Sequence, residues 1–176
     1  MLYNTAQLIK DSIGATRHCV LDGQLAELDE NNPGLVRFQG TVVLMRSALG
    51  VLATVDAQFE ANQVCRRCLE PIHNMFKLHF EEEYLPTIDI ETGLKIKLDD
   101  DVDPALLIDE HHIINISELV RQYALVELAE GNLCQPDCKG LCPECGQNLN
   151  QGSCSCKHTF TDPRLSVLTQ LLSREE

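Results

Sequence analysis

CQPDCKGLCPECGQNLNQGSCSC, residues 134–156, contains six of the chain's nine cysteines, with the spacing C-x3-C-x3-C-x2-C-x8-C-x-C. Thiolates this close together repel one another unless a cation or a covalent bridge holds them. Cys142 and Cys145 can point both sulfurs at one tetrahedral ion, and Gly146 can adopt the backbone geometry that aims amide N–H groups at those sulfurs. The stretch therefore predicts loops that a metal ion organises.

A second cysteine pair lies upstream in VCRRCLEP, residues 64–71, and the two groups together supply eight thiolates, enough for two zinc sites. In the favoured partition one site is local and the other ties the upstream pair to the start of the run. A rival partition joins the two C-x-x-C segments in one ribbon-like site. The predicted ligands are Cys65, Cys68, Cys134 and Cys138 for the first site, and Cys142, Cys145, Cys154 and Cys156 for the second.

Other chemistries of these cysteines have to be weighed. CPECG with a second C-x-x-C also resembles the iron site of rubredoxin, so a redox or iron-binding protein is the alternative hypothesis. A thioredoxin-like pair at 65–68 would need a helix N-terminus, whereas its flanks predict strands. Four-thiolate sites leave no open position for water, which disfavours a catalytic metal. Cys19 is interpreted as a small buried hydrophobe, and His158 as a surface or capping residue.

The chain has 176 residues and a net charge of −13, unevenly distributed. Residues 81–110 hold eleven acids and two lysines, a local charge of −9. This distribution disfavours a whole-chain attraction to nucleic acid and leaves RNA contact to a local basic face. We interpret the acidic stretch as a solvated loop, with a docking site for basic protein partners as the alternative.

The hydropathy pattern predicts an antiparallel sheet. Residues 35–45 and 51–60 alternate apolar and polar side chains across the short RSALG link, which is typical of a hairpin. Residues 76–80 predict a further strand, so that the cysteine pair at 65–68 lies at a turn between strands. Asp22-Gly23 indicates another turn, and residues 85–113 predict a loop.

Two helices frame this sheet in the prediction, besides a short one at 4–13. Asn115 and Glu118 form a capping pattern for a helix that ends near Gly131, and Asp162-Pro163 starts a short closing helix. The fold class is therefore α+β: an antiparallel sheet, as a meander or partial barrel, covered by a helix and followed by a cysteine-rich zinc module. The predicted domains are 1–131 and 132–176.

No stretch approaches the roughly 20 apolar residues of a membrane span. The N-terminal segment MLYNTAQLIKDSIGA lacks the basic start, apolar middle and cleavage site of a secretory signal. We therefore expect a cytoplasmic protein, or one of an organelle stroma if a transit peptide has been removed. In such reducing compartments clustered cysteines favour metal over disulfides.

Motifs of common enzyme classes do not occur: there is no G-x-x-x-x-G-K-[ST], no G-x-S-x-G and no H-E-x-x-H. No pair of carboxylates is singled out as an acid–base couple, and no small-molecule substrate is indicated. The sequence thus favours a protein that is not an enzyme, with no catalytic residues.

CRRCLEP, followed by C-x3-C-x-G-L-C-P-x-C-G-x-N-L-N, C-x-C and D-P-R-L-x-x-L, resembles the YceD family of large ribosomal RNA subunit accumulation proteins. The resemblance covers most of the chain and implies a role in the accumulation of large-subunit ribosomal RNA. It implies pre-ribosomal RNA, ribosomal proteins or assembly factors as partners, and it transfers no catalytic residue.

The leading hypothesis is a non-enzymatic zinc-binding accessory factor for ribosome biogenesis. Zinc would fix the geometry of a binding surface and bring basic side chains near one another. A purely structural adaptor that uses the acidic 81–110 segment is a further alternative. The candidate residues for RNA or partner binding are Arg66, Arg67, Lys139, Lys157 and Arg164.

Overall fold

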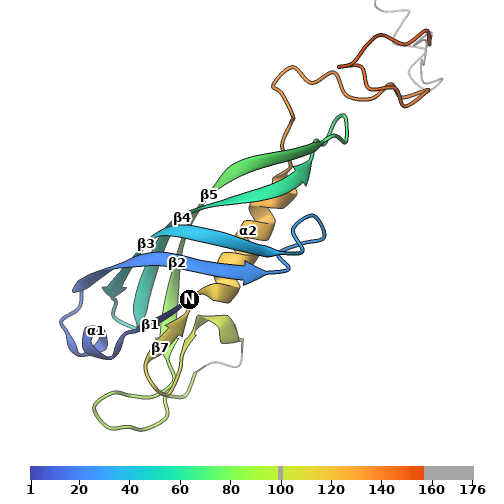
Figure 1. Ribbon diagram of the computed structural model, residues 1–176. Coiled ribbons are helices and arrows are strands. Elements are labelled where there is room, and N and C mark those ends of the chain that lie inside the picture. The colour runs from blue at the N-terminus through green and yellow to red at the C-terminus, as the bar shows by residue number, and fades with distance from the viewer. Residues whose placement is uncertain (99–100, 157–176) are drawn as a thin grey trace, which may run out of the picture. The chain divides into compact units, whose positions relative to one another are not determined.

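The computed structural model describes residues 1–98 and 101–156 (Figure 1). The chain forms two compact units. The larger consists of Met1–Cys65 and Glu70–Asn132, and the smaller of Arg66–Leu69 and Leu133–Glu176. The closing helix predicted after Asp162 lies outside the described residues.

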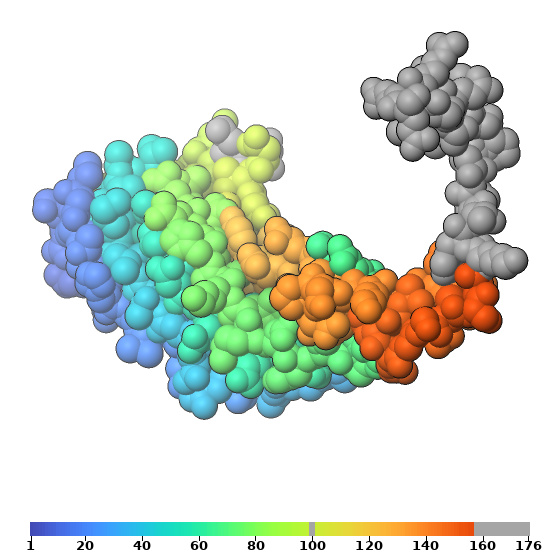
Figure 2. Space-filling view, turned by 90° about the horizontal axis from the view of Figure 1, so that it is seen from above, coloured from blue at the N-terminus to red at the C-terminus, as the bar shows by residue number. Residues whose placement is uncertain are grey.

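The larger unit is built on a five-stranded sheet in the order β2-β3-β4-β5-β6. β2, β3, β4 and β5 form an antiparallel meander, of which the sequence predicted the last three strands, and in Figure 2 their colours follow one another from blue to green. The short β6 pairs in parallel with β5, so the sheet is mixed rather than wholly antiparallel. A separate two-stranded sheet joins β1 to β7. The strands are β1 Leu2–Asn4, β2 Thr16–Ala26, β3 Leu35–Arg46, β4 Val51–Val64, β5 Pro71–Pro86, β6 Leu107–Ile108 and β7 Ile113–Asn115.

β4 is the central strand of the sheet, and its side chains alternate between a buried and a less buried face. From Val51 to Val64 its buried positions recur at every second residue, because successive side chains of a strand point to opposite faces. Phe59 on this strand lies between Phe38 on β3 and Phe76 on β5, with ring centroids 4.7 and 5.2 Å apart. These stacked cross-strand neighbours form an aromatic row in a core that is mostly aliphatic.

Two sequence interpretations of the loops were wrong. Asp22-Gly23 is not a turn, because β2 runs through it and Gly23 pairs with Phe38. Asp22 there accepts two hydrogen bonds from the Arg37 guanidinium, at 2.9 and 2.7 Å, which favours strand pairing over the local turn preference. Residues 85–113 are not loop throughout, because they include the end of β5, β6, the start of β7 and a 3₁₀ turn at Pro104–Leu106.

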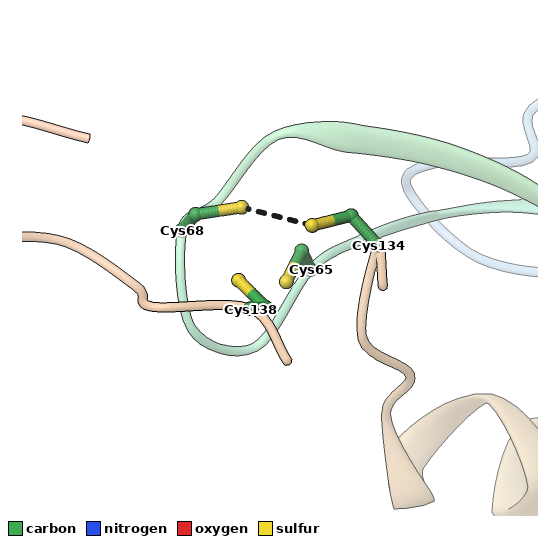
Figure 3. Close-up of side chains that lie close together, drawn as sticks. All are labelled: Cys65, Cys68, Cys134 and Cys138. Carbon is green, nitrogen blue, oxygen red and sulfur yellow. Dashed lines mark hydrogen bonds between the residues drawn. The ribbon is translucent and has the colours of Figure 1, made fainter. Parts of the chain in front are cut away.

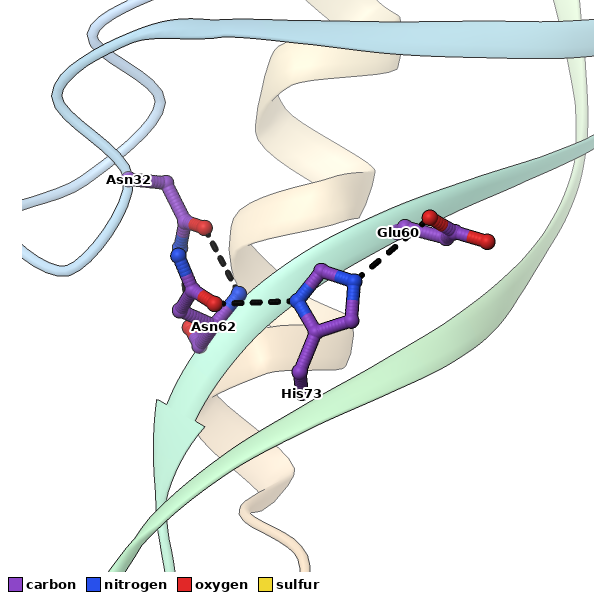
Figure 4. A network of polar contacts seen from close by, with 4 residues as sticks. All are labelled: Asn32, Glu60, Asn62 and His73. Atoms are coloured by element: carbon purple, nitrogen blue, oxygen red, sulfur yellow. Dashed lines mark hydrogen bonds and ion pairs between the residues drawn. The ribbon is translucent and has the colours of Figure 1, made fainter.

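The chain reverses instead between β2 and β3, and a buried asparagine holds that connection. Asn32 is 4% exposed. Its side-chain amide donates to the Asn62 oxygen over 2.9 Å and accepts from the Asn62 nitrogen over 2.7 Å (Figure 4). The side chain thus pairs with β4 as a neighbouring strand would, and His73 on β5 extends the network by a 2.9 Å contact with the Asn62 side chain.

One helix, α2 from Ser117 to Glu130, packs on the sheet, and a short helix, α1, spans Ala6–Lys10. The Asn115 side chain accepts from the Ser117 nitrogen at 3.0 Å at the start of α2, and Gly131 follows its end at φ 67°. Tyr123 stacks on Phe80 of β5, with ring centroids 4.5 Å apart. Among the described residues, no helix combines the length and apolar character needed to cross a membrane.

Candidate metal centres

The turn between β4 and β5 presents the first cysteine pair, as the sequence predicted. The nitrogen of Cys65, directly after β4, donates to the oxygen of Glu70 over 2.8 Å and closes the turn. Leu69 adopts φ 59°, an uncommon backbone geometry for a residue with a side chain. This tight turn brings the sulfurs of Cys65 and Cys68 within 4.8 Å of each other, and Figure 3 shows that of Cys68 pointing toward Cys134.

Two cysteines from the later run complete this first group, which comprises Cys65, Cys68, Cys134 and Cys138 (Figure 3). Its four sulfurs lie within 4.8 Å of one another, and those of Cys68 and Cys134 are 3.5 Å apart. A tetrahedral ion with sulfur ligands at 2.3 Å requires sulfur separations of about 3.8 Å. Only small adjustments therefore separate this group from a metal-bound geometry.

The second group is local to the run and comprises Cys142, Cys145, Cys154 and Cys156, whose sulfurs also lie within 4.8 Å of one another. Cys142 is buried, whereas Cys145 is exposed and the other two are half-buried. In the first group three cysteines are buried and only Cys134 is exposed. The first group is therefore better shielded from solvent than the second.

Backbone hydrogen bonds arrange the smaller unit around the two groups. The Leu141 nitrogen donates to the Arg67 oxygen over 3.2 Å, and the Leu149 nitrogen donates to the Gly140 oxygen over 2.9 Å. Gly140 has φ 75°, and a Cβ there would lie 3.1 Å from the Arg67 oxygen. A glycine is thus needed for the close approach of segments 66–68 and 139–142.

Hydrogen bonds to sulfur shape the acidity of the thiols. Donation by the backbone N–H of Cys145 lowers the pKa of Cys142 to about 6. Burial opposes ionisation of Cys138, but donors led by the Asn150 side chain outweigh it and lower the Cys138 pKa. Conversely, the hydrogen bond of Cys156 to Cys145 raises the pKa of Cys156. Without a cation, four such thiols do not all ionise together, whereas a bound metal deprotonates its thiol ligands.

The donor sets fit a metal. No disulfide links any of the nine cysteines, all of which lie within the described residues. Two groups of four thiols each could therefore hold an ion. The grouping follows the first of the two partitions considered from the sequence. In the rival partition, as in a rubredoxin-like iron site, the two C-x-x-C segments would share one ion, but in the structure each segment lies with other cysteines.

The candidate basic residues fall into three cases. Arg66 and Lys139 are exposed in the smaller unit. Arg67 is also exposed, but its guanidinium donates to the Cys138 oxygen over 2.9 Å, so this side chain supports the first cysteine group. Lys157 and Arg164 lie outside the described residues, as does His158.

Sequence reasoning missed one residue of this site, Asn150. Its amide donates to the Cys138 sulfur over 3.2 Å. An asparagine between cysteine ligands is a common loop residue, and only the fold shows that it reaches the other group. No pattern in the sequence indicated this contact.

The fold and the site define a class of protein that combines a mostly antiparallel β-sheet with two candidate metal centres of four cysteines each. The chain belongs to the YceD family, described as large ribosomal RNA subunit accumulation protein YceD, which it matches over residues 53–172. The match includes both cysteine groups and leaves out β2 and β3.

The chain is also similar to several curated proteins, one of which carries the family's name. An uncharacterized protein of Mycobacterium tuberculosis is 28% identical over 128 residues, or 72% of this chain. The chain spans 58% of the length of that relative, and an uncharacterized protein of Mycobacterium bovis gives the same figures. A maize protein, large ribosomal RNA subunit accumulation protein YCED homolog 1, chloroplastic, is 47% identical over 45 residues, covering 25% of this chain and 15% of its own length. No solved structure matches the chain.

Proposed function

We propose that this chain is a non-enzymatic, zinc-binding accessory factor that supports accumulation of large-subunit ribosomal RNA during ribosome biogenesis. Membership of the YceD family carries the ribosomal part of the proposal. The two groups of four cysteines carry the zinc part. The proposed compartment is the cytoplasm or an organelle stroma, the latter in keeping with the chloroplastic maize relative.

Zinc is the metal we favour because both groups consist of thiols alone. Four thiolates fill the tetrahedral shell that zinc takes in structural sites and leave no position for a substrate. The alternative is a mononuclear iron centre with a redox role. That alternative is weakened because neither group joins the two C-x-x-C segments as a rubredoxin-like site would.

The partner we propose is pre-ribosomal large-subunit RNA or a ribosomal or assembly protein, contacted through the smaller unit. With a net charge of −13, the chain as a whole would repel RNA phosphates. The described part of the smaller unit, by contrast, carries Arg66, Arg67 and Lys139 against Asp137 and Glu144. Arg66 and Lys139 are exposed, and they are the side chains that we propose for contact with a partner.

The experiment that tests the function replaces the gene for this chain in its source organism with variants. The readout is the ratio of large- to small-subunit ribosomal RNA. We expect this ratio to fall on deletion and to recover with the wild-type gene. We expect it not to recover with Cys65→Ser plus Cys68→Ser, because removal of two ligands abolishes a closed site. An unchanged ratio after deletion would overturn the ribosomal role.

A second experiment tests the contact surface. Arg66→Glu with Lys139→Glu should weaken co-purification of the chain with pre-ribosomal particles and leave its metal content intact. The matched control is Lys10→Glu with Lys77→Glu, two exposed lysines of the larger unit with the same change in net charge. Equal loss in both double variants would indicate a general charge effect and remove the smaller unit from the proposal.

A further inference from the structure

The side-chain amide of Asn150 donates two hydrogen bonds and accepts two, and every partner lies in the smaller unit. The amide nitrogen donates to the Cys138 sulfur over 3.2 Å and to the Asn148 side-chain oxygen over 3.0 Å. The amide oxygen accepts from the Lys139 nitrogen over 2.8 Å and from the Gln135 side chain over 3.2 Å. Two donors and two acceptors exhaust the capacity of an asparagine.

Three of these partners belong to the segment that contributes Cys134 and Cys138 to the first cysteine group. Cys138 is itself a member of that group, Lys139 follows it in the chain, and Gln135 follows Cys134. The backbone of this segment forms a hydrogen-bonded turn, because the Cys138 nitrogen donates to the Gln135 oxygen over 3.1 Å. Asn150 therefore supports the two ligands that residues 134–138 contribute, one by direct donation to sulfur and both through the adjoining residues.

In the chain, Asn150 lies between two members of the second cysteine group. It lies in the loop 146–153, which is bounded by Cys145 on one side and Cys154 on the other. Both bounding cysteines are members of the second group. An ion bound there would fix both ends of this eight-residue loop and reduce the conformations open to it.

We propose that Asn150 couples the two metal centres, so that metal in the second group strengthens metal binding by the first. The loop held by the second ion keeps the amide of Asn150 against the Cys138 sulfur. This inference rests on the proposed binding of metal by both groups. By linkage the effect is reciprocal, and metal in the first group strengthens binding by the second to the same degree.

The size of the effect follows from the type of contact. Hydrogen bonds to metal-ligating side chains hold the ligands in orientation, and their removal lowers metal affinity by about 10-fold to 100-fold. We expect Asn150→Ala to lower the affinity of the first group within that range. The second group should lose affinity only through the coupling, since its own sulfurs keep their donors, such as the Cys145 nitrogen 3.5 Å from the Cys142 sulfur.

The backbone also connects the two groups, and its effect has to be distinguished from that of the Asn150 side chain. The Leu149 nitrogen donates to the Gly140 oxygen over 2.9 Å, so the same loop is also held to segment 139–142 by its backbone. Asn150→Ala leaves this backbone bond available. Coupling that persisted in Asn150→Ala would therefore run through the backbone and not through the side chain, and it would overturn the role of Asn150.

The experiment is a double-mutant cycle on the full chain, loaded with Cd²⁺ and titrated with a chelator. Cadmium NMR gives a separate resonance for each four-thiolate centre and so reports the affinity of each. The four proteins are the wild type, Asn150→Ala, Cys145→Ser with Cys154→Ser, and the variant that combines all three changes. Gln147→Ala is the matched control, because Gln147 is an amide of the same loop whose side chain donates to the Ser153 oxygen and not to sulfur.

We expect the affinity of the first group to fall by about 10-fold or more in Asn150→Ala and in the double serine variant. In the combined variant, the affinity of the first group should fall no further than in the weaker-binding of these two variants. Gln147→Ala should bind metal as the wild type does. Additive losses, or an unchanged first group in Asn150→Ala, would overturn the coupling. A wild-type chain that binds no metal would overturn the metal part of the proposed function as well, so the two failures are distinguishable.

Asn150→Asp keeps the proposal testable if the alanine variant does not assemble. Aspartate retains an oxygen for the Lys139 nitrogen and the Gln135 side chain but replaces the donor to sulfur with a second acceptor. We expect the first group to lose affinity in this variant while the second group still binds. Wild-type affinity of the first group in Asn150→Asp would overturn the role of the donor.

Discussion

The side-chain amide of Gln63 on β4 donates to the main-chain oxygen of Leu128 on α2 over 2.6 Å, within the larger unit. Gln63 is 6% exposed, and its side-chain oxygen also accepts from Asn132 over 3.2 Å. A buried polar side chain on the otherwise apolar face of β4 thus fixes the last turn of α2 to the end of the central strand.

Gln63→Leu should lower the free energy of unfolding of the larger unit by about 1 kcal/mol, because it removes a net hydrogen bond and leaves the Asn132 amide without this acceptor. Urea denaturation at saturating zinc measures the change. Gln58→Leu is the matched control, since Gln58 lies on the same strand but is exposed. Equal stability of the two variants would contradict the role of Gln63.

Gly40 on β3 pairs with Ala57 on β4. A Cβ at this position would lie 2.0 Å from the Asp56 oxygen, whereas at Gly34 it would meet nothing within 4 Å. Gly40→Ala should therefore destabilise the sheet by about 1–3 kcal/mol, as overpacking does, and Gly34→Ala should not. Thermal unfolding measures the stability of the two variants. If Gly40→Ala were as stable as Gly34→Ala, β3 and β4 would have to lie farther apart than described.

The Asp22–Arg37 ion pair gives a pH dependence. Hydrogen bonds from Arg37 hold the pKa of Asp22 below its usual value. A carboxyl whose pKa is lower in the folded than in the unfolded chain stabilises the fold above the unfolded value, and this contribution is lost as the pH falls through the folded pKa. NMR titration should show the pKa of Asp22 rising toward its usual value in Arg37→Gln. An identical Asp22 pKa in both proteins would contradict the pairing.

Metal removal should act on the two units differently. In the larger unit, hydrogen bonds between long strands and the stacked rings of Phe38, Phe59 and Phe76 do not depend on the cysteines. Under a chelator and a reductant, amide hydrogen exchange should accelerate strongly over residues 134–156, while β3 and β4 stay protected. Readdition of zinc should restore protection. Unchanged exchange in the cysteine run would show that metal does not organise it.

Alternation predicted β3, β4 and β5 because each has one buried and one exposed face, which gives a period of two. The same reasoning failed at Asp22-Gly23, where a local turn preference was overridden by pairing of β2 with β3. It also missed β6 and most of β7, since strands of two and three residues are too short to show a period.

The cysteine spacing was informative about the site because each C-x-x-C forces two sulfurs together within one turn. It left the partition open, because nothing in the spacing tells which pairs meet across the fold. The contact from Asn150 to Cys138 was beyond reach for the same reason. It depends on the hydrogen bonds that hold segment 147–150 beside segment 139–142, and these are a property of the folded unit.

The central claim is that two groups of four cysteines each hold one zinc ion. Elemental analysis of the chain, purified under reducing conditions and quantified per mole of protein, tests it most directly. We expect two zinc ions per chain, falling to one in Cys145→Ser with Cys154→Ser. Iron in place of zinc, or no bound metal, would contradict the account.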